Sequence, residues 1–447
     1  MSNKRIGAKN FGDIYVEGKR YRSRREWRGV VDTLYDYSRW LYNWINMFRI
    51  VLVKPRNIKA MFRYRWMANY LAVPMMVDRH TQGLRGEHLR ICHAEQDVII
   101  EDVAKLLDKL FRGDRRIGND EEFSKKVVLV DENEMQSVMM GFPTVVPLSR
   151  EIASTYIPVL LNQRAAIHYI DVAQEYGLAG DVCPMPEAEA GVSIDDDAPI
   201  LGCCAVQCNT TCDGSLLSNG VISKRMEFED GIPVFQLASP LRHMNEDVQE
   251  YAAQEIRNAI AFIEEHTGEK WDWDYYFECA KRVNYATKCR LEWLEMSKSP
   301  YPQVFGSNLA LYTETNYMAI SGRLPIFEKT DRKIMRLAEK AYKKKKMAAN
   351  EYRHRAIVWG VQSHYYMDLL VWMLNCWGIV PLTDMLSMDN TTMIAEEDTP
   401  ENREQAMYDI AMLTEKMIMR NRTHGGYKVR LTTSGRSLRS SMPIWSS

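Results

Sequence analysis

The sequence of 447 residues has no long hydrophobic run and almost no net charge. No stretch reaches the roughly 18 consecutive apolar residues of a membrane-spanning helix, and residues 1–20 lack the apolar core of a secretory signal. The 58 basic and 59 acidic side chains nearly cancel, which argues against binding of nucleic acid through general positive charge. We therefore expect a soluble, cytoplasmic protein that contacts neither membrane nor nucleic acid.

Two catalytic motifs are also absent. The chain has no Gly-x-Ser-x-Gly nucleophile elbow, which leaves a serine hydrolase without support. It has no Gly-x-x-x-x-Gly-Lys-Ser/Thr loop, so any ATP that its reaction needs is expected to be hydrolysed by another protein. The nine cysteines, an odd number without a secretory signal, indicate reduced thiols or metal ligands rather than a disulfide framework.

Hydrophobic spacing divides the chain into four expected regions. These are a helical N-terminal region (1–135), a first α/β domain (140–245), a helical connecting region (246–350) and a second α/β domain (351–447). The predicted class is α/β, with two doubly wound parallel-sheet domains of flavodoxin or Rossmann type. In the first region, basic residues mixed with aromatic ones near Trp27 favour an amphipathic helix docked on a partner over an RNA-stacking surface.

Within the first α/β domain the pattern alternates between short apolar runs and helical spacing. Ser149 is placed to cap a helix through Ile152 and Ala153, and Gly177 to end the helix Ala165–Tyr176. The expected strands are Ile157–Leu161, Pro199–Cys208 and Ile232–Leu237.

Further along, helical and strand patterns follow one another to the end of the chain. Expected helices are Glu246–Glu265, Tyr275–Met296, Asp331–Met347, Tyr365–Leu374 and Glu401–Arg420, and expected strands are His354–Val361 and Trp377–Pro381. The basic run Lys343–Lys346 is expected to be the solvent-exposed end of a helix rather than a phosphate-binding site.

Two cysteines are placed to act as ligands. Cys212 directly follows an expected strand, where open parallel sheets bind ligands, and Cys183 lies in a loop after a capped helix. Cys203 and Cys204 fall inside an apolar strand and are expected to be core residues. Cys92, Cys279 and Cys289 lie in helical segments and are expected to be structural.

Several segments in collinear order resemble the 2-hydroxyacyl-CoA dehydratase and benzoyl-CoA reductase family. They are Pro147–Ile152, the Cys183 loop, Thr210–Gly214, Gly231–Val234, Thr267–Asp274, His354–Trp359, Gly378–Val380 before Asp384, and His424–Tyr427. Together they cover residues 141–427 and look most like the larger (alpha) subunit of the 2-hydroxyglutaryl-CoA dehydratase type.

This resemblance implies a lyase of anaerobic amino-acid fermentation. An ATP-dependent iron-sulfur activator would supply one electron, and a 4Fe-4S cluster would pass it to the thioester carbonyl of a (R)-2-hydroxyacyl-CoA, which loses water through a ketyl radical. The implied partners are a smaller dehydratase subunit in a heterodimer, the activator and the acyl-CoA substrate. The resemblance leaves a flavin open, and no residue indicates one.

Carried onto this sequence, the family pattern makes Cys183 and Cys212 the first two cluster ligands. The usual third cysteine follows an Asp, yet Asp384–Met388 contains none; Cys376, one strand earlier, either replaces it or packs in the core. If the third cysteine is missing, two alternatives remain. The chain is an active subunit whose cluster has a different ligand, or it is a non-catalytic scaffold subunit whose partner holds the active cluster. Ring reduction of the benzoyl-CoA reductase type is a further alternative.

The C-terminal segment differs in character from what precedes it. Residues 429–447 are rich in Arg, Ser and Thr and lack strand alternation. Suitable codons for residues 431–447, read one nucleotide out of register, encode an amphipathic helix and a strand. We therefore expect a frameshift near Leu431 and a truncated second α/β domain, and an intact reading frame on resequencing would contradict this.

Overall fold

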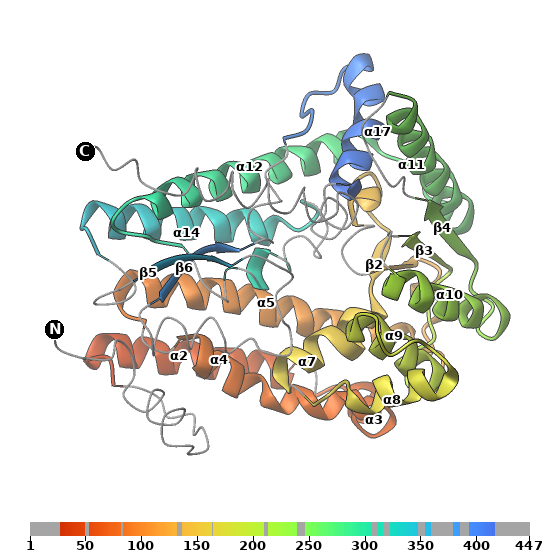
Figure 1. The fold of residues 1–447 in the computed structure, drawn as a ribbon, viewed down its shortest axis with the longest axis horizontal. Helices are drawn as coiled ribbons and strands as arrows, with labels where there is room; N and C mark the ends of the chain where they lie inside the picture. The colour runs from red at the N-terminus through yellow and green to blue at the C-terminus, as the bar shows by residue number, and fades with distance from the viewer. Residues whose placement is uncertain are drawn as a thin grey trace.

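The computed structural model describes residues 27–49, 53–81, 84–131, 136–162, 164–209, 213–238, 246–304, 309, 311–313, 315, 322–346, 354–358, 379–384 and 393–415. They form an α/β fold with a four-stranded and a two-stranded parallel sheet among many helices (Figure 1). The predicted fold class is thereby confirmed. Within these ranges no helix combines the length and apolar character needed to cross a membrane.

The larger sheet has the strand order β2-β1-β3-β4, and all its neighbours are parallel. The strands are β1 (Val127–Val130), β2 (Val146–Leu148), β3 (Cys204–Asn209) and β4 (Val234–Ala238). β3 and β4 correspond to expected strands, with later starts. β1 and β2 were not predicted, although β1 is central and its four side chains are buried.

One expected strand is wrong. Residues Ile157–Leu161 form helix α7, which continues a π-helical turn, η4 (Ile152–Tyr156). All five side chains of α7 are buried, so the run shows no alternation that distinguishes strand from helix. Ser149 decides the local structure, because its Oγ accepts a hydrogen bond from the Ile152 amide at 3.2 Å. The predicted cap is therefore confirmed.

Four further described helices belong to this part, and the second of them was not predicted from the sequence. They are α8 (Ile167–Tyr176), α9 (Pro184–Ile194), α10 (Asp213–Phe228) and α11 (Glu246–Thr267). Gly177 ends α8 with a φ of 109°, the left-handed conformation that glycine adopts without strain. The glycine cap read from the sequence is confirmed.

The N-terminal part is helical, as predicted. It contains α2 (Val30–Met47), α3 (Pro55–Arg63), η2 (Arg65–Ala72), α4 (Val73–Thr81), α5 (Gly86–Gly113) and the short α6 (Glu121–Ser124). α2 exposes large apolar side chains, among them Val31 at 71% and Leu34 at 66%. Docking of this face on a partner stays a prediction.

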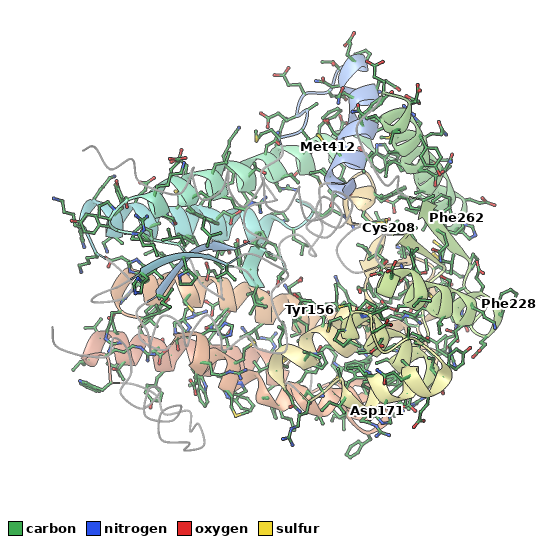
Figure 2. The ribbon with its side chains drawn as sticks, viewed as in Figure 1. Tyr156, Asp171, Cys208, Phe228, Phe262 and Met412 are labelled. Atoms are coloured by element: carbon green, nitrogen blue, oxygen red, sulfur yellow. The ribbon has the colours of Figure 1, made fainter. Side chains whose placement is uncertain are left out.

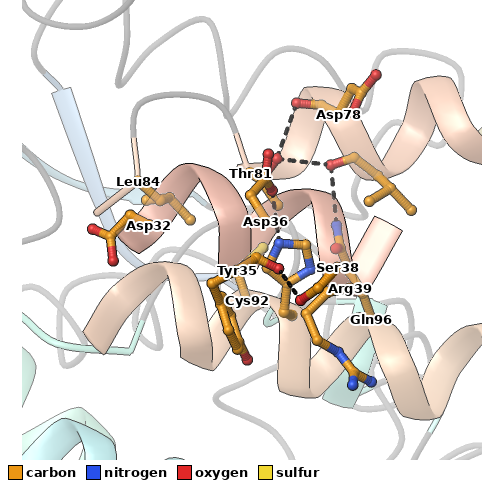
Figure 3. A network of polar contacts seen from close by, with 12 residues as sticks. Asp32, Tyr35, Asp36, Ser38, Arg39, Asp78, Thr81, Leu84, Cys92 and Gln96 are labelled. Atoms are coloured by element: carbon orange, nitrogen blue, oxygen red, sulfur yellow. Dashed lines mark hydrogen bonds and ion pairs between the residues drawn. The ribbon is translucent and has the colours of Figure 1, made fainter. Parts of the chain in front are cut away.

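A buried polar network joins α2, α4 and α5 (Figure 3). Asp36 lies 2.8 Å from a guanidinium nitrogen of Arg28 and 2.8 Å from Nε2 of His93. A second guanidinium nitrogen of Arg28 donates to the carbonyl of Thr81 at 2.9 Å. The buried charge of Asp36 is thus paired and hydrogen-bonded, as a charge without solvent requires.

The second half contains α12 (Trp273–Lys298), α14 (Pro325–Lys343) and α17 (Pro400–Glu415), with β5 (His354–Val358) paired to β6 (Ile379–Asp384). The expected helix Tyr365–Leu374 lies outside the described residues. Residues 343–346 are exposed, and the ammonium groups of Lys340 and Lys344 lie 3.1 and 3.4 Å from Glu87. These basic residues end a helix at the surface, as predicted.

The larger sheet separates two hydrophobic cores. Val127 and Leu129 of β1 point into a core shared with Leu107 of α5 and with α14, whereas Val128 and Val130 point into a core shared with α11, α12 and α17. This alternation follows from the two-residue period of a strand. Helices therefore cover both faces, which leaves the carboxyl edge of the sheet as the place for a site.

Candidate functional site

Cys183 stands at the start of helix α9. It is the N-terminal capping residue, its side chain is exposed, and Pro184 occupies the first helical position. Proline favours this position because its fixed φ suits a first turn and its missing N–H would have had no partner. A thiol at a helix N-terminus faces the positive end of the helix dipole, which favours the thiolate that binds metals.

The first turn of α10 packs against the first turn of α9. A Cβ built on Gly214 lies 3.6 Å from the Cβ of Cys183 and 3.3 Å from Cγ of Pro186. Gly214 itself is buried. Two helix N-termini thus meet beside the exposed Cys183 thiol, and Gly214 follows Cys212 by two positions in the sequence.

Asn219 holds α10 at the carboxyl edge of the larger sheet. Its Nδ2 donates to Oδ2 of Asp131 at 3.0 Å and to the carbonyl of Cys208 at 3.0 Å. Asp131 directly follows β1, and Cys208 is near the end of β3. The bonds from Asn219 therefore place the N-terminal half of α10 where parallel sheets bind ligands. Figure 2 labels Cys208 in the sheet and Phe228 at the other end of α10.

A second polar group fixes α10 over the sheet. Gln207 and Gln236 face one another across β3 and β4, and Nε2 of Gln236 donates to Oε1 of Gln207 at 3.1 Å. Ser223 of α10 donates to the same Gln207 oxygen. Because Gln207 is buried, these bonds satisfy its carbonyl away from water.

The other described cysteines are less suited to binding a metal. Cys204 and Cys208 are fully buried in the core, while Cys203 is half-buried and its thiol donates to the carbonyl of Val127 at 3.2 Å. Burial raises the pKa of Cys279 and of Cys289 to about 11, which disfavours the thiolate. Cys92 is buried too, and burial raises the pKa of its thiol. Their placement agrees with the structural roles predicted for Cys92, Cys279 and Cys289.

Two of the three predicted ligands, Cys212 and Cys376, lie outside the described residues. In the part of the chain that the structure does describe, no group of three or more His, Cys, Asp and Glu side chains is arranged to hold a metal ion. Among the described residues, the exposed thiol of Cys183 is therefore the candidate ligand for a cluster. The meeting of α9 and α10 around it was not predicted, because a contact between Gly214 and Pro186 leaves no local pattern.

The chain matches a family model along most of its α/β part. The model describes the D-component of 2-hydroxyglutaryl-CoA dehydratase, and it matches residues 144–431, more than half of the chain. The chain belongs to this family. It is accordingly a component of the dehydratase class and, at the level of the family, a lyase. No curated protein matches it.

The D-component match spans all the segments that suggested the family in the sequence. It starts three residues after Gly141 and includes Cys183, Cys212 and Cys376. The helices α2 to α5, with the buried network around Asp36, precede the matched part. The family match therefore covers β2, β3, β4 and the helices α9 and α10, but neither the N-terminal helices nor strand β1.

Proposed function

We propose that the chain is a subunit of an iron-sulfur 2-hydroxyacyl-CoA dehydratase, in which Cys183 and Cys212 hold a 4Fe-4S cluster. The family match supports the class of enzyme. The observation that carries the cluster site is the contact of Gly214 with Cys183, because it brings the beginning of α10, two positions after Cys212, against the exposed thiol. Thiolates are the ligands that iron-sulfur clusters require.

When bound, the cluster would supply one electron to the thioester carbonyl of a (R)-2-hydroxyacyl-CoA, so that water leaves through a ketyl radical. The chain's own contribution is electrostatic and geometric. The N-termini of α9 and α10 bring their positive dipole ends together, which stabilises thiolates and an anionic cluster. Asn219 keeps α10 in that position.

The proposed partners follow from the class of enzyme. A smaller dehydratase subunit would complete a heterodimer, and an ATP-dependent iron-sulfur activator would deliver the electron. The third thiolate ligand of the cluster would come from Cys376 or from a cysteine that does not match the family's cysteine pattern.

An iron and acid-labile sulfide assay tests the proposal. The chain is purified anaerobically together with its smaller subunit, as the unaltered protein and as the variants C183S, C212S, C376S and C203S. We expect C183S and C212S each to lose most of the iron and sulfide. C203S is the matched control, because Cys203 is also partly accessible but its thiol bonds to the Val127 carbonyl, and it should retain both.

The outcome distinguishes the alternatives. Full iron content in C183S and C212S would contradict the cluster site and leave a scaffold subunit whose partner holds the cluster. Loss of iron in C376S would identify the third ligand. Turnover of a 2-hydroxyacyl-CoA supports the dehydratase, whereas reduction of benzoyl-CoA alone would replace it with ring-reducing chemistry.

A further inference from the structure

A cavity of about 340 Å³ lies between α5, β2 and the segment around Arg323. This is the size of a small-molecule site. None of its described lining residues belongs to α9 or α10, so it is separate from the Cys183 site. Most of its wall is apolar, built by Val103, Leu106, Val145, Leu148, Ile152, Ile157 and Leu324.

Two cations also line this cavity. Lys109 lies seven residues after Asp102 on α5, so both side chains are on one face of the helix, two turns apart. Among the described residues, no carboxylate lies within ion-pairing distance of Lys109 or Arg323. The pKa of Lys109 is lowered, because desolvation of its ammonium group outweighs the opposing charge of Asp102. The two cations affect each other, since Arg323 also lowers the pKa of Lys109.

Arg323 is held rigidly at the wall. Its Nη2 donates to the carbonyl of Phe142 at 2.7 Å and to that of Val145 at 2.6 Å. Its Nη1 is buried and has no hydrogen-bond partner among the described residues. Carbonyl groups orient the guanidinium group but leave its positive charge without a counter-charge.

We propose that this cavity binds an apolar chain that ends in a carboxylate, with Lys109 and Arg323 as its counter-charges. Two cations at one apolar wall, of which Lys109 is exposed and Arg323 half-buried, suit a ligand that combines hydrocarbon with one negative charge. The carboxylate belongs either to a free organic acid or to the far end of an acyl-CoA chain. Binding at this cavity does not depend on the iron-sulfur function proposed above.

Asp102 gives the site a testable pH dependence. Burial raises the pKa of Asp102 to about 6, Lys109 and Lys105 oppose this shift, and Glu101 adds to it. Above about pH 6 the Asp102 carboxylate repels a bound anion, and below it the neutral carboxyl group does not. The affinity for a carboxylate should therefore rise as the pH falls from about 7.5 to about 5.5, where a simple carboxylic acid is still mostly ionised.

Isothermal titration calorimetry of the full chain with pentanoate tests this, with pentanamide as the uncharged probe. We expect pentanoate to bind at least about tenfold more tightly than pentanamide, K109M to weaken pentanoate by about tenfold, and D102N to strengthen it at pH 7.5 and remove the pH dependence. A gain of affinity in D102N cannot come from misfolding. The control is K105M, whose ammonium group pairs with Glu101 and does not line the cavity.

Equal binding of pentanoate and pentanamide, or unchanged pentanoate binding in K109M and D102N, would overturn the proposal. Competition identifies the source of the carboxylate. Displacement of pentanoate by glutaryl-CoA and not by butyryl-CoA supports an acyl-CoA chain, displacement by neither supports a free acid, and equal displacement by both contradicts recognition of the carboxylate. Because no iron is needed in these titrations, their failure is distinguishable from loss of the cluster.

Discussion

Asn219 and Asp131 are joined by a hydrogen bond of 3.0 Å that links helix α10 to the end of strand β1. The same Asn219 amide donates to the carbonyl of Cys208 in β3, and its side chain is only 3% exposed. One amide thus connects the helix that follows Cys212 to two adjacent strands.

Replacing Asn219 by alanine should lower the free energy of unfolding by about 1–3 kcal/mol, because two buried hydrogen bonds are lost. Urea unfolding monitored by circular dichroism measures this. N258A is the matched control: Asn258 is an exposed helical asparagine, and its loss should change the unfolding free energy by less than about 0.5 kcal/mol. Equal effects of the two changes would contradict the role given to Asn219.

Gly214 leaves little room for a side chain. G214V should push the first turn of α10 away from Pro186 and Cys183, with a loss of about 1–3 kcal/mol in the free energy of unfolding and a lower iron content. Gly220, on the same helix, has open space around a built Cβ, so G220A should instead stabilise the chain by up to about 1 kcal/mol. Normal iron content in G214V would show that the contact is unimportant for the cluster.

Asp36 is the shared acceptor of the buried network between α2, α4 and α5. D36N should cost about 3–5 kcal/mol, because the buried guanidinium group of Arg28 loses its counter-charge. Thermal unfolding of D36N against D32N measures the difference. Asp32 pairs with Arg90 at a more exposed position, so its change should cost less than about 1 kcal/mol.

Asp331 should make the chain less stable as the pH rises from about 4 to about 6. Burial raises its pKa to about 6, opposed by the hydrogen bond from Tyr312 and the charge of Arg290, while Glu328 adds to the rise. Between about pH 4 and pH 6 the folded state therefore holds a proton that the unfolded state has released, and stability falls as the pH rises through this window. At pH 7.5 the loss approaches about 3 kcal/mol.

The variant D331N tests this pH dependence. It should be more stable than the unaltered chain at pH 7.5 by about 2–3 kcal/mol, and the gain should vanish near pH 4. Chemical unfolding at a series of pH values measures both. A gain that does not vary with pH would contradict the titration of Asp331.

Helices with a clear period and a recognisable cap could be predicted from the sequence. Glu246–Glu265 was expected and α11 spans Glu246–Thr267, because its apolar spacing is regular and Gly268 follows it. The strand β2 was missed because it is three residues long and contains Pro147, which only an edge strand accommodates. β1 was missed because Val127–Val130 is a uniformly buried run without alternation.

The candidate site was predictable only in part. The position of Cys183 in a loop after a capped helix was predicted. The helix α9 that begins directly after it was not, although Pro184 favours a first helical turn. The packing of Gly214 on that turn is a contact between residues about thirty positions apart, and Asn219 differs from an ordinary helical asparagine only in what its helix is packed against. Such contacts depend on the tertiary arrangement of α9, α10 and the sheet.

The core that contains Leu107 and Leu129 joins the N-terminal helices to strand β1 and to α14. The family-matched portion, cut out by itself, would therefore expose to water the apolar side chains that the N-terminal helices cover in this core. A shortened version starting at residue 144 would also lack β1, the strand between β2 and β3. Work on this protein therefore needs the helices that the family match leaves out.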